Sequence, residues 1–263
     1  MYKIAVASAP AQSFLFGEHA VLYGYPAIAC AVDVRSRVIA RRREDKKVVL
    51  RSNAFKLEFR GENLNGRIKG NGPEGLSILA KCLEEILVKN NYREGIDITI
   101  RSEIPLASGM GSSASVAASM IKAVSAVIGR ELSGEELLNE VYKAETRIHG
   151  RASKTGPAVS VYGGLVKIEW ISGEMRISRV RDIIKLPLIM VYSGIKGETM
   201  KMIEKVKELK SRIPTVVENI MEAIGELVKE AEKELIVDMY LNEALMESFQ
   251  EEEGKILTKE QEG

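Results

Sequence analysis

The residues of this 263-residue chain best suited to chemistry lie in a glycine- and serine-rich segment, residues 104–115, which reads Ile-Pro-Leu-Ala-Ser-Gly-Met-Gly-Ser-Ser-Ala-Ser. Gly109 and Gly111 would let the backbone approach a ligand closely. Ser112 and Ser113 fall where a following helix would present its unpaired N–H groups and the positive end of its dipole. The segment is therefore predicted to bind an anion such as a nucleotide triphosphate.

Two familiar phosphate motifs fit this segment less well. A Walker A loop needs a Lys-Ser/Thr pair after its glycines, and the segment contains no lysine. A dinucleotide-binding fingerprint needs a second strand ending in an acidic residue about twenty residues later. At that distance the chain reads Gly-Arg-Glu-Leu-Ser-Gly over residues 129–134, which is typical of a turn. A glycine turn with a serine helix cap is the alternative that involves no ligand.

The segment lies between a predicted strand and a predicted helix. Residues 96–101 alternate apolar and polar side chains, the pattern of a half-buried strand, and Pro105 ends it. Residues 116–128 are rich in Ala, Met and Ile and contain no Gly or Pro, as a buried helix requires. Similar patterns predict a strand over 27–42 and a helix near 76–87. This order favours an α+β domain over a regular βαβ repeat.

Glu145 is the second candidate for a functional side chain. Ser133 and Glu136 form a predicted capping box that begins a helix running to about His149. Glu145 falls near the centre of the apolar face of this helix, which carries Leu137, Leu138, Val141 and Ile148. A buried charge is costly unless it is paired or bound to a metal, so Glu145 is a predicted site residue. A buried salt bridge to an arginine is the alternative.

The chain is predicted to divide into two domains. Residues 149–160 read as a polar loop, and residues 161–170 read as a strand that follows it. We place the boundary between them, which gives domains 1–160 and 161–263.

Later patterns predict further elements of the second domain. Residues 186–193 read as a central strand. Helices are expected around 199–209 and 214–235, and the Glu- and Lys-rich end of the chain is expected to be a solvated tail.

The composition limits the classes of partner. The 38 Lys and Arg residues nearly balance the 37 Asp and Glu residues, which argues against nucleic acid and anionic membranes as partners. The chain has no signal-peptide pattern and no apolar run of membrane-spanning length, so a cytoplasmic protein with a small-molecule partner is expected. Cys30 and Cys82 lie in apolar stretches without metal-site spacing and are predicted to be buried free thiols.

Three segments together resemble the GHMP small-molecule kinases, and within them the archaeal-type mevalonate kinases. Residues 7–24, Ala-Ser-Ala-Pro-Ala-Gln-Ser-Phe-Leu-Phe-Gly-Glu-His-Ala-Val-Leu-Tyr-Gly, resemble the opening motif of that family. Residues 105–115 resemble its ATP loop, and residues 145–164 its catalytic loop. The resemblance implies an α+β, two-domain fold, with an N-terminal mixed sheet covered by helices and a C-terminal ferredoxin-like α/β domain.

The resemblance also implies an activity and its residues. The activity would be phosphorylation of the mevalonate 5-hydroxyl in isoprenoid biosynthesis, with ATP and Mg²⁺; a symmetric homodimer is common for such enzymes. The implied ATP-binding residues are Pro105, Leu106, Ala107, Ser108, Gly109, Met110, Gly111, Ser112, Ser113 and Ala114. Ser113 and Glu145 would hold Mg²⁺. Glu18 and His19 would lie beside the substrate, although a hydrogen-bonded core histidine is an alternative for His19 and is favoured for His149.

The chain departs from the pattern of the family at both catalytic positions. Gln12 stands where the family has a lysine near the transferred phosphate, and Gly156 stands where it has an aspartate that acts on the substrate hydroxyl. Residues 151–161 contain no other acid. General-base help is worth about 10²–10⁴ in rate, so slow catalysis is expected.

A third departure concerns the end of the chain. The chain ends at Gly263 without the late glycine-rich segment of the family, so we expect the sheet of the second domain to be incomplete. Two alternatives to a mevalonate 5-kinase stay open. One is a related small-alcohol kinase, such as one that phosphorylates mevalonate at the 3-hydroxyl, and the other is a nucleotide-binding relic without catalysis.

Overall fold

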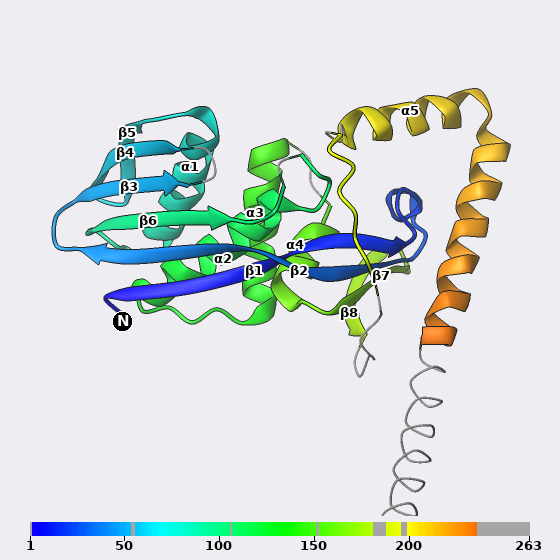
Figure 1. Ribbon diagram of the computed structural model, residues 1–263, viewed down its shortest axis with the longest axis horizontal. Coiled ribbons are helices and arrows are strands. Elements are labelled where there is room, and N and C mark those ends of the chain that lie inside the picture. Colours follow the sequence, from blue (N-terminus) through cyan, green and yellow to red (C-terminus); the bar gives the residue numbers. More distant parts are fainter. Residues whose placement is uncertain are drawn as a thin grey trace, which may run out of the picture.

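The computed structural model describes residues 2–53, 56–105, 107–150, 153–180, 188–195 and 199–235. These residues form one eight-stranded sheet with the strand order β5-β4-β3-β6-β2-β7-β8, in which β1 pairs with β2 (Figure 1). The strands are β1 (Ile4–Phe16), β2 (Ala27–Arg43), β3 (Lys47–Ser52), β4 (Leu57–Leu64), β5 (Arg67–Asn71), β6 (Gly95–Ser102), β7 (Leu165–Ile171) and β8 (Glu174–Val180). The predicted strands at 27–42 and 96–101 are confirmed as β2 and β6.

The long strand β2 organises the sheet. β1 pairs antiparallel along one edge of β2, from Ile4 opposite Arg41 to Phe16 opposite Ile28. On the other edge β6 pairs with residues 36–43 and β7 with residues 27–30, both antiparallel. Only β3 and β6 run parallel among the pairs of the described residues. The C-terminal ends of these two strands therefore lie at the same edge of the sheet.

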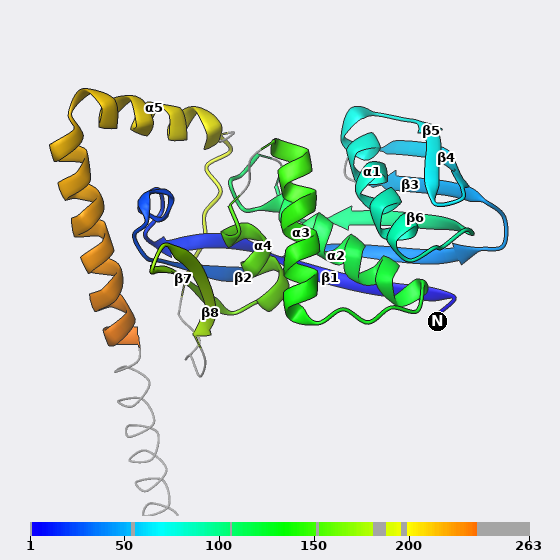
Figure 2. The ribbon, with the colours of Figure 1, turned by 180° about the vertical axis from the view of Figure 1, so that it is seen from behind.

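Helices cover one face of this sheet (Figure 2). They are α1 (Glu74–Lys89), α2 (Ser112–Val127), α3 (Gly134–His149) and α4 (Thr155–Tyr162). The main core lies between these helices and the strands, and it includes Val38, Leu83, Ile98, Met120 and Val141. The alternation of the strands and the helical spacing on α1 and α3 agree with the residues that are buried there. The predicted α+β architecture is confirmed.

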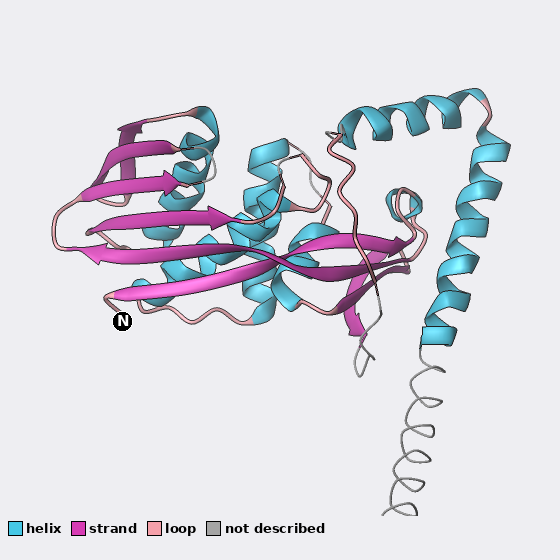
Figure 3. Ribbon diagram, viewed as in Figure 1, coloured by secondary structure: helices cyan, strands magenta, loops and turns pink. Residues whose placement is uncertain are grey.

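Two more helices cover the end of the sheet where β1 leads into the short 3₁₀ helix η1 (Ala20–Tyr23) (Figure 3). They are α5 (Thr199–Arg212) and a helix over residues 214–235, as the sequence predicts. Val217 and Met221 pack with Ala20, and the Tyr25 hydroxyl donates a 2.9 Å hydrogen bond to Glu218. The second helix is thereby fixed to the η1 turn.

Two sequence predictions are wrong in this half of the chain. Described residues 188–193 of the predicted strand 186–193 form no strand, and Ile189 and Val191 are 91% and 86% exposed. An apolar, β-rich pattern needs a neighbouring strand, and the described residues supply none there. Residues 155–160 of the predicted loop form the start of α4 instead, so β7 begins only at Leu165. The domain boundary after residue 160 stays a prediction.

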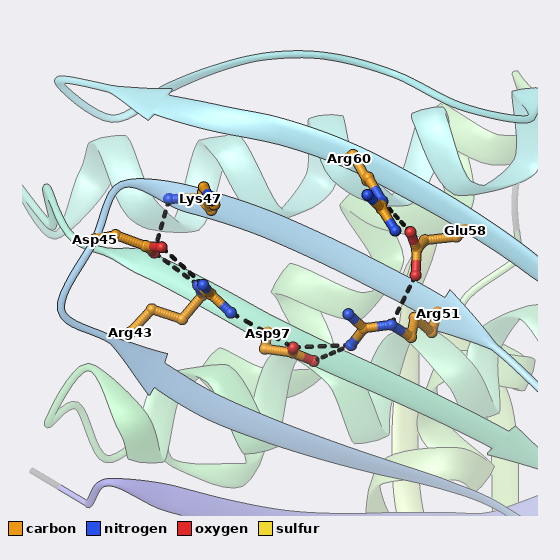
Figure 4. Close-up of polar contacts among 7 residues, drawn as sticks. All are labelled: Arg43, Asp45, Lys47, Arg51, Glu58, Arg60 and Asp97. Carbon is orange, nitrogen blue, oxygen red and sulfur yellow. Dashed lines mark hydrogen bonds and ion pairs between the residues drawn. The ribbon is translucent and has the colours of Figure 1, made fainter.

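A ladder of charges crosses the sheet on the face away from the helices (Figure 4). Arg51 on β3 donates two 2.8 Å hydrogen bonds to Asp97 on β6 and a 2.7 Å bond to Glu58 on β4. Arg43 on β2 pairs with Asp45, whose pKa is lowered to about 2, chiefly by this hydrogen bond. Arg43 also lies 3.8 Å from Asp97, so the ladder links β4, β3, β6 and β2 on the face opposite α1 to α4.

Both cysteines of the chain lie in the described residues. Cys30 and Cys82 are buried free thiols, as predicted, and burial raises the pKa of both. Among the described residues, no helix has the length and apolar character needed to cross a bilayer.

Candidate active site

The predicted anion loop leads from the end of β6 into the first turn of α2. Ala107, Gly109 and Gly111 have positive φ angles of 54°, 74° and 65°, which turn the backbone sharply before the helix. Ser108 Oγ closes the loop by donating a 2.8 Å hydrogen bond to the Pro105 carbonyl. Gly111 is the N-cap residue, and no side chain caps the helix. The first N–H groups of the 16-residue helix α2 are thus available to an anion. Leu106 lies outside the described residues.

Gln12 on β1 contacts this loop through both its backbone and its side chain. Its backbone N–H donates a 3.0 Å hydrogen bond to the Met110 carbonyl. Its side chain lies against Gly111, where a Cβ atom would come within 2.7 Å of Gln12 Cγ. A Cβ at Gly111 would therefore force the Gln12 side chain to move, whereas a Cβ at Gly109 would meet no protein atom within 4 Å. Of the two glycines, only Gly109 faces open space as the sequence argument expected.

Gln12 and Gly156, where the resemblance leads us to expect catalytic side chains, are neighbours in space. A Cβ at Gly156, in the first turn of α4, would lie 3.2 Å from Gln12 Nε2 and 3.6 Å from Ala114 Cβ. Gln12 Oε1 is buried and accepts no hydrogen bond. The structure thus brings Gln12, Gly156 and the first turn of α2 together, although 144 positions of the sequence separate the first two.

A pair of glycine variants tests the packing of this loop. We expect Gly111→Ala to destabilise the protein by about 2–3 kcal/mol, since alanine there is strained by its positive φ and also overlaps Gln12. Gly109→Ala is the matched control, because it carries the positive φ without the overlap and should cost about 1 kcal/mol. Thermal unfolding measures both. Equal destabilisation by the two variants would contradict the contact between Gly111 and Gln12.

Glu145 points inward from α3, as its place on the helix predicts. The capping box is present, since Ser133 Oγ accepts from the Glu136 N–H and the Glu136 carboxylate accepts from the Ser133 N–H. Glu145 is 8% exposed, and its Oε1 has no hydrogen-bond partner. Burial raises the pKa of the carboxyl, and the Ser113 hydroxyl and His149 oppose that rise. No arginine pairs with Glu145 in the described part of the chain, and Arg151 lies outside it, so the salt-bridge alternative stays open.

His149 is the functional candidate that the sequence argument missed. Its Nε2 lies 3.1 Å from Ser113 Oγ and 3.9 Å from Glu145 Oε2. The side chain is 49% exposed, so the favoured interpretation as a core histidine is wrong. The available signal was its position four residues after Glu145, which places both side chains on one face of α3.

The structure places Glu18 and His19 in the turn between β1 and η1. His19 has a φ of 65° and is partly buried, and Glu18 is exposed. Within the described ranges, no hydrogen bond or ion pair links either side chain to the anion loop or to Glu145. Their proposed place beside the substrate stays a prediction.

Ser113 and Glu145 have the chemistry of a Mg²⁺ site. Magnesium prefers oxygen ligands and commonly takes only one or two carboxylates, with water and phosphate oxygens completing its shell. The unpartnered Glu145 Oε1 and the Ser113 hydroxyl supply two such oxygens. In the described part of the chain, no group of three or more Asp, Glu, His or Cys side chains could hold a metal by itself. The residues present therefore fit a Mg²⁺ ion that arrives with a nucleotide.

An open hollow of about 470 Å³ lies at the end of β3 and the start of β4, lined by Arg51, Ser52, Asn53, Lys56, Leu57 and Glu58. The Asn53 N–H donates a 3.1 Å hydrogen bond to the Ile100 carbonyl on β6. The anion loop follows the same end of β6. The hollow and the loop thus lie at one edge of the sheet.

Comparison with known proteins identifies the family. Residues 77–164, which include the anion loop and Glu145, match the GHMP kinases N terminal domain. The chain belongs to the GHMP kinase superfamily. The mevalonate kinase of Pyrococcus horikoshii is 35% identical over 227 residues, which cover 84% of this chain and 66% of that protein. The mevalonate kinase of Methanothermobacter thermautotrophicus is 32% identical over 217 residues.

The fold agrees with that family. The crystal structure of Methanococcus jannaschii mevalonate kinase superposes with a TM-score of 0.68 at 25% identity, covering 87% of this chain and 72% of that one. This member of the GHMP kinase superfamily thus shares the sheet and covering helices of its relatives, as the sequence resemblance predicts. The chain spans about two thirds of the length of the Pyrococcus protein.

Proposed function

We propose that this GHMP kinase transfers the γ-phosphoryl group of ATP to the 5-hydroxyl of mevalonate, with Mg²⁺. The observation that carries the proposal is the buried Glu145 carboxylate, whose Oε1 has no hydrogen-bond partner, beside Ser113 at the uncapped N-terminus of α2. Similarity to mevalonate kinases over most of the chain supports the choice of substrate.

The triphosphate would lie on the first turn of α2. The N–H groups of residues 112–114 and the helix dipole stabilise its negative charge there, and the open space at Gly109 admits a phosphate. The hollow at the end of β3 lies at the same sheet edge and could take the rest of the nucleotide. Binding of ATP by this chain thus depends mainly on backbone groups.

Ser113 and Glu145 would hold the Mg²⁺ ion. When bound, the ion neutralises charge that develops on the phosphate oxygens. The chain contributes a hydroxyl and a buried carboxylate, and their separation from bulk water strengthens the attraction between carboxylate and ion. The Glu145 Oε1 atom, which has no hydrogen-bond partner in the structure, would gain a partner when the ion binds.

Gln12 and Gly156 supply no charge to the reaction. Phosphoryl transfer depends mainly on positioning and electrostatic stabilisation, and a largely dissociative transition state demands little prior deprotonation of the acceptor hydroxyl. Transfer can therefore proceed slowly from the loop, Ser113 and Glu145, with the Gln12 amide available to donate a hydrogen bond. Glu18 and His19 are proposed to contact mevalonate.

A second candidate function is nucleotide binding without transfer, which the uncharged Gln12 and Gly156 favour. Release of ADP distinguishes the two when mevalonate, phosphomevalonate, homoserine and galactose are offered in turn with MgATP. The proposal predicts ADP release stimulated by mevalonate alone. If another alcohol stimulates ADP release, that alcohol is the substrate instead of mevalonate. If the chain binds ATP but no alcohol stimulates ADP release, the second function is favoured.

The remaining predictions belong to the same proposal. They are a cytoplasmic location, the absence of nucleic-acid and membrane partners, and a homodimer. The near balance of acidic and basic residues supports a small-molecule partner.

A further inference from the structure

We propose that His149 is a positioning residue for Ser113, and that its Nε2 accepts a hydrogen bond from the Ser113 hydroxyl when that hydroxyl binds the metal ion. The inference rests on the proposed function, because it assumes a metal–nucleotide complex at Ser113 and Glu145. The inference adds His149 to this site as a residue that orients a metal ligand and does not itself bind the metal.

The geometry places His149 where this task requires it. His149 is the last residue of α3, one turn after Glu145, and Gly150 follows as the C-cap with a φ of 73°. The imidazole Nε2 reaches Ser113 Oγ at 3.1 Å, within hydrogen-bond distance, but lies 3.9 Å from Glu145 Oε2. The hydrogen bond of His149 is therefore made to the serine, and Glu145 Oε1 is left without a partner.

The chemistry of a hydroxyl ligand explains why an acceptor matters. A serine hydroxyl has one proton and two lone pairs. When a lone pair binds a cation, the O–H bond becomes more polar and its proton needs an acceptor that does not compete for the same ion. A neutral imidazole protonated on Nδ1 presents Nε2 as such an acceptor. Half of the His149 side chain is exposed, so water can accept from the Nδ1–H.

This arrangement also leaves Glu145 free for the ion. The Ser113 hydroxyl already lies beside the Glu145 carboxylate and opposes the rise of its pKa that burial causes. A hydrogen bond from Ser113 to His149 would direct the hydroxyl proton away from Glu145 and leave the carboxylate lone pairs to the metal. With His149, both Glu145 oxygens can face the ion or its water. Hydrogen-bond partners of metal ligands typically contribute 10–100-fold to metal affinity, which sets the expected size of the effect.

The test measures ATP affinity by isothermal titration calorimetry, with excess Mg²⁺ and with EDTA, for the wild type, His149→Ala, His149→Gln and Lys143→Ala. The gain from Mg²⁺ should fall about 10–100-fold in His149→Ala. Affinity in EDTA should be unchanged. The glutamine side chain offers an amide oxygen near the position of the imidazole Nε2, so His149→Gln should recover most of the gain. Lys143→Ala removes an exposed residue of α3 that pairs with Glu140, and it should keep the whole gain.

The outcomes separate this inference from the proposed function. A wild-type gain from Mg²⁺ that His149→Ala fully retains would overturn the inference alone. Loss of ATP affinity in EDTA by His149→Ala would also overturn it, because a general structural role would then explain the effect. A wild type that binds ATP equally with and without Mg²⁺ would overturn both.

Discussion

The double variant Gln12→Lys, Gly156→Asp is expected to turn over mevalonate about 10²–10⁴-fold faster than the wild type. The two positions adjoin each other and the first turn of α2, so a lysine at 12 and an aspartate at 156 would face the same phosphate. The lysine would neutralise charge in the transition state, and the aspartate would accept the hydroxyl proton. Steady-state ADP release with mevalonate measures the gain.

The structure can accept both substitutions. A Cβ at Gly156 would come within 3.2 Å of the end of the wild-type Gln12 side chain and 3.6 Å of Ala114 Cβ, and a flexible lysine at position 12 can move to make room. Gly156 lies in the first turn of α4, where an aspartate interacts favourably with the helix dipole. Each charge would also be the partner of the other, so we expect either single variant to gain less than the pair.

Gln12→Lys with Gly156→Asn is the matched control. Asparagine has the shape of aspartate and replaces glycine in the same helix, but it cannot act as a base. A double variant no faster than this control would show that the missing aspartate does not limit the rate.

Glu145→Gln is expected to abolish the Mg²⁺-dependent tightening of ATP binding and to leave binding of metal-free ATP unchanged. The amide keeps the shape of the side chain but removes the negative charge that would hold the ion. Titration calorimetry with and without Mg²⁺ measures the change. Glu140→Gln is the control on the same helix, since Glu140 pairs with Lys89 at 2.8 Å and should not affect the metal. Unchanged Mg²⁺ dependence in Glu145→Gln would remove this residue from the site.

The thermal stability of Glu145→Gln tests independently whether the Glu145 carboxylate has a stabilising partner in the metal-free protein. Burial raises the pKa of Glu145, so the folded protein binds its proton more tightly than the unfolded chain does. Stability from this group is therefore present below the ordinary carboxyl pKa and is lost as pH rises through the raised value. At neutral pH and without metal, the variant should unfold at a temperature no lower than that of the wild type. A clearly lower temperature would indicate a partner for the carboxylate.

Local patterns in the sequence were sufficient for the parts of the site that lie on regular elements. The spacing of apolar residues on α3 predicted the inward direction of Glu145, and the strand-loop-helix order predicted the uncapped start of α2. Contacts between distant segments could not be predicted in this way. The packing of Gln12 against Gly111 and Gly156 depends on β1 lying beside α2 and α4. The hydrophobic period of a single segment does not show which distant segments it packs against.

The errors have the same physical origin. Gly156 and Pro157 read as loop residues, but both are tolerated in the first turn of a helix, and α4 begins there. The apolar residues 188–193 read as a strand, but a strand requires a neighbour for its hydrogen bonds. His149 was predicted to be a core residue. Its exposure depends on where α3 ends relative to α2, and the local sequence does not show this.

The most direct test of the proposed activity is transfer of labelled γ-phosphate from ATP to mevalonate by the purified chain with Mg²⁺, with the phosphorylated position assigned by NMR. We predict slow formation of mevalonate phosphorylated at the 5-hydroxyl. Phosphate on the 3-hydroxyl would contradict the position assigned to the acceptor. Binding of MgATP without any labelled mevalonate would contradict the activity itself.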